Sequence, residues 1–468
     1  MTMWKRSEPS LASATVASMR ASGGVVAGRR TGWRSAVLAF AAGLCAVSAV
    51  ASAQLAAPGP ATGLADSAAL RATVFGTPPQ AMAALPDTVP LTEIDVALPW
   101  RRPTPDVFWF NRRLRAWFSA QPHAAPLAIV IAGTGSDGNS TSNQTLRAVL
   151  YGAGYHVLTL PSPTFPRFIV AASHTGVAGD LWQDSQDLYA AIVALRADLP
   201  RETKIEAIDI LGTSLGGAHA AVVKAIDARE HRIGIRRAVM INPPVSLFAS
   251  IGRLDKLFAQ SIGTDDRAVE RLYQRLYAQL ANAYRASNAV ELDANFLLGA
   301  AASILKTDEE FSAAIAFTFR IALVNLFFAG DLYAHTGVVV DPAHPPKVGE
   351  DLEHYARALR GKTFAEYFDG VFVPYYTQHR AGATKASLVA QSRLDIIGKE
   401  LREDPDYYAM TNSDDLILDR GELDWLKRTL GSRIVVYDHG GHLGNLGERQ
   451  QMADLLEMLR GRWHGAAR

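Results

Sequence analysis

Short apolar runs alternate with helical patterns along most of the chain. The strand-like runs lie at residues 127–132, 156–160, 207–211, 238–241, 407–410 and 434–437. Between them, residues 181–199 and 218–228 place apolar side chains every three to four positions, which is the period of a helix with one buried face. Strands that alternate with helices predict βαβ units. We therefore expect an α/β fold, with a mostly parallel sheet flanked by helices.

The alternation stops between residues 245 and 400, where no strand pattern occurs. Helical periodicity appears there instead, at residues 268–286, 294–305, 311–329 and 351–359. This pattern predicts a helical cap, residues 245–400, inserted into a sheet domain made of residues 91–244 and 401–468. The run 311–329 is apolar enough to raise the question of a membrane span. Arg320 at its centre would be costly in lipid, so we expect a buried or groove-lining helix.

The N-terminal segment, residues 1–53, has the pattern of a secretory signal peptide. Arginines precede an apolar stretch at residues 36–50, which ends in the sequence Ala-Ser-Ala at residues 51–53. The stretch is short for a membrane span, so we expect cleavage after Ala53, a secreted or periplasmic protein and no stable span in the mature chain. Residues 54–90 are rich in Ala and Pro without a sustained period, which predicts a linker.

Composition narrows the classes of protein and site. The chain of 468 residues is 49% hydrophobic and 20% charged, as is typical of a globular protein. Its 47 basic and 46 acidic residues leave a net charge of +1, which argues against a nucleic-acid partner. The single cysteine, Cys45, lies in the predicted signal peptide, so neither a disulfide framework nor a cysteine zinc site is expected.

A candidate nucleophile lies at residues 212–216, whose sequence is Gly-Thr-Ser-Leu-Gly. This G-x-S-x-G pattern follows a strand-like run and opens a helix of small residues. Such a turn is tight enough to force the serine into a strained conformation, and glycines on either side leave room for strand and helix to pass. We therefore predict Ser214 as a nucleophile.

A serine nucleophile needs a base, and two histidines follow the last strand-like run. His442 is favoured over His439 because glycines before and after it give its loop room to reach the sheet edge. A metal site made of Asp438, His439 and His442 is the weak alternative, since no further cluster of ligands accompanies them. We expect neither a metal nor an organic cofactor.

The acid that orients the base is expected between the serine and the histidine. Asp414 and Asp415 follow the strand-like run 407–410, at the edge of the sheet where the nucleophile is expected. Either carboxylate could hold the imidazole in the required tautomer. Asp415 is favoured because two apolar residues follow it, and Asp414 is then expected to shape the turn.

A glycine-rich loop follows the first strand-like run, at residues 133–138. It matches G-x-G-x-x-G, but a dinucleotide fold would need an acid at the end of the next strand, and residues 156–161 contain none. The loop suits an oxyanion hole better, because glycine lets backbone N–H groups approach a substrate oxygen. We expect these donors to be the amides of Thr134 and Leu215.

These motifs together resemble the α/β-hydrolase superfamily, over residues 96–460. The nearest branch is the YheT-like hydrolases, which are described as esterases. The residues that carry the resemblance are 212–217, 241–245, 364–369, 414–415 and 439–444. One departure is Ala132 before Gly133, where that branch usually has histidine; the backbone donors survive this change. The resemblance implies a sheet with a helical cap over its C-terminal edge.

The predicted function is hydrolysis of a small-molecule carboxylic ester through an acyl-enzyme, with Ser214, Asp415 and His442 as the triad. The alternatives are an acyltransferase that uses the same site and a non-catalytic binding protein with a hydrolase fold. Aromatic residues of the predicted cap suggest a lipophilic acyl group, although packing within the cap is the favoured interpretation. These residues are Phe311, Phe317, Phe319, Phe327 and Phe328.

Overall fold

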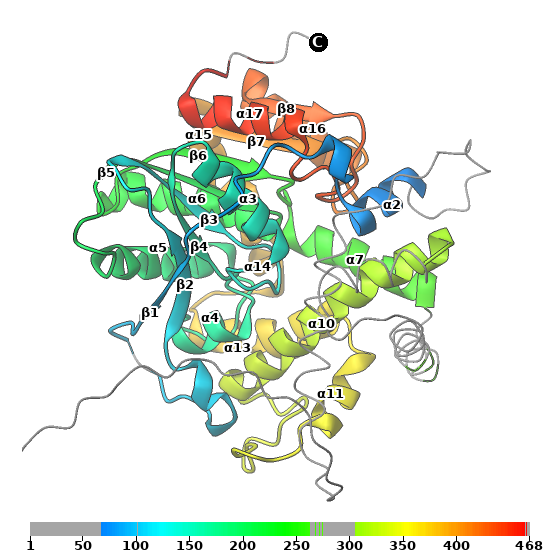
Figure 1. Cartoon of the computed structure of the whole chain (residues 1–468). Coiled ribbons are helices and arrows are strands. Elements are labelled where there is room, and N and C mark those ends of the chain that lie inside the picture. The colour runs from blue at the N-terminus through cyan, green and yellow to red at the C-terminus, as the bar shows by residue number, and fades with distance from the viewer. Residues whose placement is uncertain are drawn as a thin grey trace, which may run out of the picture.

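The molecule is built on one eight-stranded sheet (Figure 1). The computed structural model describes residues 67–100, 102–262, 305–463 and 465, together with Arg267, Arg271 and Gln274. The strand order is β1-β2-β4-β3-β5-β6-β7-β8. The strands are β1 (Thr92–Val96), β2 (Leu114–Ser119), β3 (Ala125–Ile131), β4 (His156–Leu160), β5 (Ile205–Thr213), β6 (Ile235–Ile241), β7 (Tyr407–Asn412) and β8 (Ile434–Tyr437).

Strands β3 to β8 form the parallel part of the sheet, and β2 is antiparallel to both β1 and β4. All six strand-like runs of the sequence lie in the parallel part, because strands buried on both faces read as continuous apolar runs. Strands β1 and β2 were not predicted. They carry charged residues, and the Arg115 guanidinium pairs across the two strands with the Asp95 carboxylate at 2.9 Å.

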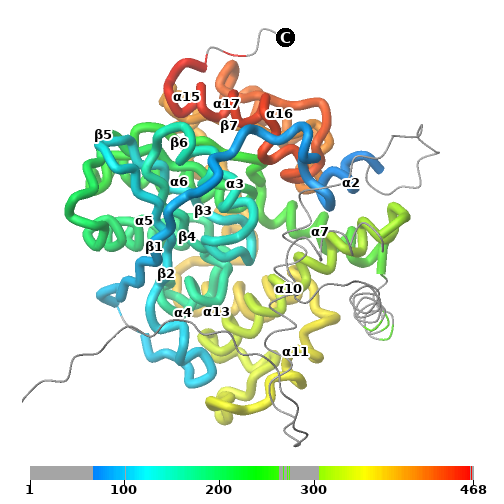
Figure 2. Tube along the Cα trace, in the orientation of Figure 1, coloured from blue at the N-terminus to red at the C-terminus, as the bar shows by residue number. Residues whose placement is uncertain are grey.

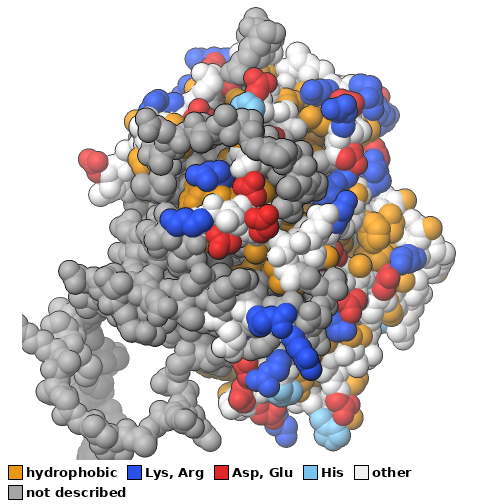
Figure 3. Space-filling view, turned by 90° about the vertical axis from the view of Figure 1, so that its right-hand side faces the viewer, with side chains coloured by type: hydrophobic (Ala, Val, Ile, Leu, Met, Phe, Trp, Pro, Cys, Tyr) orange, Lys and Arg blue, Asp and Glu red, His pale blue; other side chains and the backbone are white. Residues whose placement is uncertain are grey.

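Helices cover both faces of the sheet. One face packs against α5 (Leu181–Ala197), α6 (Leu215–Glu230) and α16 (Arg420–Leu430), and the other against α3 (Thr141–Gly152) and α17 (Arg449–Arg460). The predicted α/β architecture is therefore confirmed, and the strand order is that of the α/β-hydrolase fold. Among the described residues on the face drawn in Figure 3, acidic and basic side chains occur side by side.

A helical cap follows β6 and returns to the sheet at β7 (Figure 2). The chain leaves and re-enters the sheet domain side by side, since Ser246 and Arg393 form an isolated β-bridge. The described helices of this insertion are α7 (Leu247–Ile262), α10 (Asp308–Ala334), α11 (Glu353–Arg360), α12 (Phe364–Tyr367), α13 (Val373–His379) and α14 (Lys385–Gln391), with α15 (Gly398–Glu403) at its end. Apart from Arg271 and Gln274, which are helical, the predicted helix 268–286 lies outside the described residues, and so does nearly all of 294–305.

Helix α10 is the one described helix that is long and apolar enough to cross a membrane. Most of its apolar window is buried within the protein, where it packs against α7 and α2 (Ser67–Phe75). Arg320 is 2% exposed, and its guanidinium lies 3.9 Å from the centre of the Phe258 ring. A buried cap helix is what the sequence led us to expect.

The predicted linker, residues 54–90, is wrong over its described part. Residues 67–75 form helix α2, residues 79–81 form a 3₁₀ turn, and Leu70 is fully buried against α10. The helix contacts the cap on one side and the loop after β8 on the other, so its sequence shows no polar face and no amphipathic period. Residues 54–66 and the predicted signal peptide, 1–53, lie outside the described residues.

Burial of His219 in α6 makes stability depend on pH. Desolvation lowers the pKa of His219 to about 3, and its Nδ1 lies 2.9 Å from the Ser185 hydroxyl. An unfolded chain protonates histidine below about pH 6.5, whereas the folded protein keeps this ring neutral. The contribution of this neutral ring to the free energy of unfolding is therefore present above about pH 6.5 and is lost as the pH falls toward 3. The loss between pH 7 and pH 5 is about 2 kcal/mol.

We expect the substitution His219→Leu to weaken this pH dependence. Urea unfolding of both proteins at pH 7 and pH 5 measures it. The wild-type protein should lose more of its free energy of unfolding than the variant by about 2 kcal/mol. An equal loss in both proteins would contradict the assignment of a buried neutral histidine.

Candidate active site

Ser214 occupies the sharp turn between β5 and α6. Its φ of 53° lies in the left-handed region, which non-glycine residues rarely adopt. The turn is tight: a Cβ on Gly212 would lie 2.2 Å from the Gly216 carbonyl oxygen, and one on Gly216 would lie 2.3 Å from the Ile131 carbonyl oxygen. Both positions therefore require glycine, and the turn places Ser214 at the carboxyl end of the sheet.

His442 and Asp415 lie next to Ser214 in a continuous chain of hydrogen bonds. The Ser214 Oγ lies 3.0 Å from the His442 Nε2, and the His442 Nδ1 lies 2.9 Å from the Asp415 Oδ1. Each of the three residues is 6% exposed. The structure thus brings together the serine, histidine and acid that the sequence singled out, from the ends of β5, β8 and β7.

The two neighbouring aspartates make different contacts. Asp415 contacts the imidazole, and its carboxylate also accepts hydrogen bonds from the Asn242 side chain at 2.8 Å and from the Ile417 amide at 3.1 Å. Asp414 instead accepts hydrogen bonds from the amides of Gly440 and Gly441 in the histidine loop. Asp415 is therefore placed to orient the ring, and Asp414 to shape the loop that carries it.

The other histidine of this loop, His439, is exposed. Among the described residues, no group of three or more His, Cys, Asp or Glu side chains is placed to hold a metal ion. The alternative metal site of Asp438, His439 and His442 therefore has no support from the geometry.

The glycine-rich loop after β3 faces the nucleophile. A Cβ on Gly133 would lie 3.4 Å from the Ser214 Cβ, and both Thr134 and Leu215 line a pocket together with Ser214. Within the described part of the chain, neither the Thr134 nor the Leu215 amide donates to a protein acceptor. Both are thus available to a substrate oxygen. Burial raises the pKa of the Asp137 carboxyl, which favours its neutral form in this loop.

The loop's other glycines leave no space for a dinucleotide. A Cβ on Gly135 would lie 2.3 Å from the Ala322 Cβ of α10, and one on Gly138 would lie 2.7 Å from the Trp117 ring. These glycines allow protein packing rather than the approach of a pyrophosphate. The loop therefore connects the sheet to the cap helix beside the nucleophile.

Helix α2 holds the histidine loop, which sequence reasoning missed. The Thr73 Oγ1 accepts a hydrogen bond from the His442 amide at 2.9 Å and donates to the Ala69 carbonyl at 2.7 Å. Further along, the Thr77 hydroxyl donates to the Leu446 carbonyl at 3.0 Å. In the sequence, Asn242 stood out only as part of the stretch 241–245 that carries the resemblance. Its role beside Asp415 rests on a contact between distant segments, which no local pattern indicates.

We expect Thr73→Val to lower kcat on a simple activated ester about tenfold, because loss of one hydrogen bond loosens the His442 backbone. Thr73→Ser keeps the hydroxyl and should restore most of the rate. Steady-state kinetics of both variants measure this effect. Equal kcat in the valine variant and the wild type would show that α2 does not position His442.

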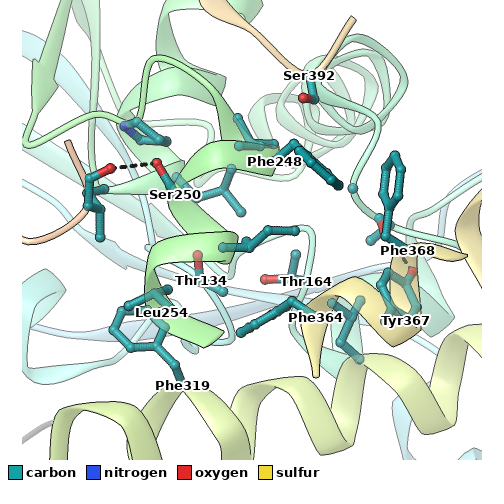
Figure 4. Close-up of a pocket in the computed structure, with 18 of the residues that line it drawn as sticks. Thr134, Thr164, Phe248, Ser250, Leu254, Phe319, Phe364, Tyr367, Phe368 and Ser392 are labelled. Atoms are coloured by element: carbon teal, nitrogen blue, oxygen red, sulfur yellow. Dashed lines mark hydrogen bonds between the residues drawn. The ribbon is translucent and has the colours of Figure 1, made fainter. Parts of the chain in front are cut away.

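Two pockets of different character meet at Ser214, and both include Thr134 and Phe319. We call the first the cap pocket; it lies beneath α7 and α12 and has a volume of about 770 Å³ including its mouth. Figure 4 shows Phe248, Phe364 and Phe368 gathered around it. We call the second the hydroxyl pocket; its polar wall is formed by His442 with Thr73, Ser136, Ser140, Ser142, Thr213 and Thr318.

Comparison with known proteins adds solved structures of low similarity. No family model matches the chain, and no curated protein is similar to it in sequence. An esterase of Pyrococcus furiosus is 12% identical, with 81% of this chain and 92% of that chain covered and a TM-score of 0.40. A fungal esterase of Rhizomucor miehei is 14% identical, with coverage of 81% and 85% and a TM-score of 0.41. Function therefore has to be inferred from the site.

Proposed function

We propose that this protein is a serine hydrolase that cleaves carboxylic esters through an acyl-enzyme. The observation that carries the proposal is the buried chain from Ser214 through His442 to Asp415, with distances of 3.0 and 2.9 Å. A hydroxyl in this setting can be deprotonated by the imidazole as it attacks an acyl carbon. The motif resemblance to the YheT-like hydrolases agrees with this activity.

Each contact has a place in the proposed reaction. Ser214 Oγ bonds to the acyl carbon, and its proton passes to His442 Nε2. Asp415 holds the other ring nitrogen and stabilises the imidazolium that forms. The amides of Thr134 and Leu215 donate to the oxyanion. His442 then gives its proton to the leaving alcohol, and a water molecule, activated by the same ring, releases the acid.

Hydrolysis of a series of p-nitrophenyl esters, with products quantified, tests this function. Release of one acid for each nitrophenol is the expected result. The same reaction with an added alcohol distinguishes hydrolysis from acyl transfer. An acyltransferase would form a new ester of that alcohol in preference to the acid. A protein that binds these esters without consuming them would contradict the proposal.

We also propose that the protein is exported and that residues 1–53 are removed. The pattern of a basic flank, an apolar stretch and an Ala-Ser-Ala site supports this. N-terminal sequencing of protein from the envelope or medium of its native host should begin at Gln54. Recovery of the chain from the cytosol with its leader intact would contradict export.

A further inference from the structure

The two pockets at Ser214 differ in chemistry. Beyond Ser214 and Thr134, the cap pocket is lined mainly by apolar side chains of α7, α10, α12 and the π-helical turn after α12, among them Phe248, Ile251, Leu254 and Phe368. The hydroxyl pocket carries six serine and threonine residues besides Ser214 and Thr134. The apolar part of its wall is formed by Val74, Ala314, Ile315, Phe319 and Leu443. A substrate that crosses Ser214 therefore meets an apolar surface on one side and a hydroxyl-rich surface on the other.

The place of His442 sets the orientation of an ester in these pockets. The leaving alcohol must receive a proton from His442 Nε2, so it has to lie on the side of that ring. His442 lines the hydroxyl pocket and is not part of the cap pocket. The alcohol therefore occupies the hydroxyl pocket, and the acyl chain extends into the cap pocket, where burial of each methylene is favourable.

The hydroxyl pocket is polar but carries no side chain with a fixed charge. None of its lining residues is Lys, Arg, Asp or Glu. Ser140 precedes the first residue of α3 without capping it, and within the described residues neither its hydroxyl nor that of Ser142 has a protein partner. Free hydroxyls both donate and accept hydrogen bonds, which suits a neutral alcohol with several hydroxyls. The lining therefore offers no Lys or Arg side chain to pair with a phosphate.

We propose that the substrate is an ester of a medium- or long-chain fatty acid with a neutral polyhydroxyl alcohol, such as glycerol or a sugar. This inference rests on the proposed serine hydrolase function. The acyl-oxygen bond of the ester breaks, water supplies the oxygen of the released acid, and the proton from His442 completes the alcohol. The cap pocket selects the chain, and Ser140 and Ser142 bind the alcohol.

A panel of dodecanoyl esters tests the alcohol side. The substrates are the methyl ester, 1-monododecanoylglycerol, dodecanoyl sucrose and the choline-phosphate lysolipid of the same chain. We expect kcat/KM to be highest for the glycerol or the sucrose ester, and the better of the two identifies the source of the polyol. The double variant S140A/S142A should lower the ratio of kcat/KM for that ester to kcat/KM for the methyl ester about tenfold, through loss of two hydrogen bonds.

The control for this experiment is Ser432→Ala, an exposed serine at the end of the sheet remote from the site. It should leave the ratio unchanged. A preference for the lysolipid, or an unaltered ratio in S140A/S142A, would overturn the polyol assignment while leaving the hydrolase proposal intact. Failure to hydrolyse any ester would instead overturn the hydrolase proposal itself.

Filling the cap pocket tests the acyl side. The variant Ile251→Trp should lower kcat/KM for dodecanoyl esters relative to butanoyl esters of the same alcohol at least tenfold, because the added ring occupies the space of the chain. Circular dichroism melting shows whether the variant is folded. If it is not, Ile251→Val is used instead, and it should raise kcat/KM for dodecanoyl esters relative to butanoyl esters by a smaller factor. A changed preference for the alcohol at constant acyl length would show that the orientation is reversed.

Discussion

Replacing Ser214 by alanine is expected to lower kcat for ester hydrolysis on the order of 10⁶-fold, because loss of the nucleophile disables the whole triad. The fold should persist. The side chain at this turn contributes one hydrogen bond, to His442, and alanine meets the same backbone strain at φ 53° that serine does. Kinetics and thermal melting of the purified variant measure the two effects separately.

The matched control is Ser432→Ala, which removes a hydroxyl from an exposed turn before β8. Its turnover should equal that of the wild type. Turnover within tenfold of wild type in a folded Ser214→Ala protein would exclude Ser214 as the nucleophile, and a matching loss in both variants would point to a defect unrelated to the site.

The second large effect is expected for Asp415→Asn, about 10⁴-fold in kcat. An amide at this position would stabilise the wrong tautomer of His442 and could not stabilise the imidazolium. The asparagine amide has nearly the same shape as the aspartate carboxylate, so the fold should be kept. The hydrogen bond from Asn242 is the contact that the substitution changes most. Steady-state kinetics at saturating substrate measure the loss.

The comparison variant is Asp414→Asn, whose carboxylate accepts hydrogen bonds from Gly440 and Gly441 rather than contacting the imidazole. An asparagine retains one acceptor oxygen for these amides, so we expect a loss of no more than about tenfold. If Asp414→Asn proves to be the crippled variant and Asp415→Asn retains its rate, the carboxylate beside His442 in the structure is not the one that orients it.

The parallel strands could be predicted from the sequence, because a strand buried on both faces is a continuous apolar run that can be recognised without knowing which strands lie beside it. The residues near Ser214 could be predicted from the sequence for a related reason. The tight turn demands glycine at 212 and 216, and the acid and the base follow strands that end at the same edge. Constraints of this kind act between residues that are close in sequence, so a local sequence pattern can indicate them.

Features that depend on distant contacts were out of reach. Strands β1 and β2 carry the paired residues Asp95 and Arg115, which interrupt their apolar positions, so neither strand has an apolar run as long as those of the parallel strands. Helix α2 is covered on several sides by segments more than two hundred residues away, which removes the polar face that would have revealed it. The sequence also could not show which phenylalanines of the cap are core residues and which line the pockets. Phe311 and Phe327 are cap core, whereas Phe319 reaches the pockets, and their sequence spacing does not distinguish them.

Active-site labelling tests the central claim most directly. The wild-type protein is treated with a fluorophosphonate, and its intact mass and the modified peptide are determined by mass spectrometry. We predict one adduct per chain, on Ser214, which is absent from Ser214→Ala and formed much more slowly in Asp415→Asn. An adduct on another residue, or none under conditions that label a known serine esterase, would contradict the assignment of Ser214, His442 and Asp415 as a catalytic triad.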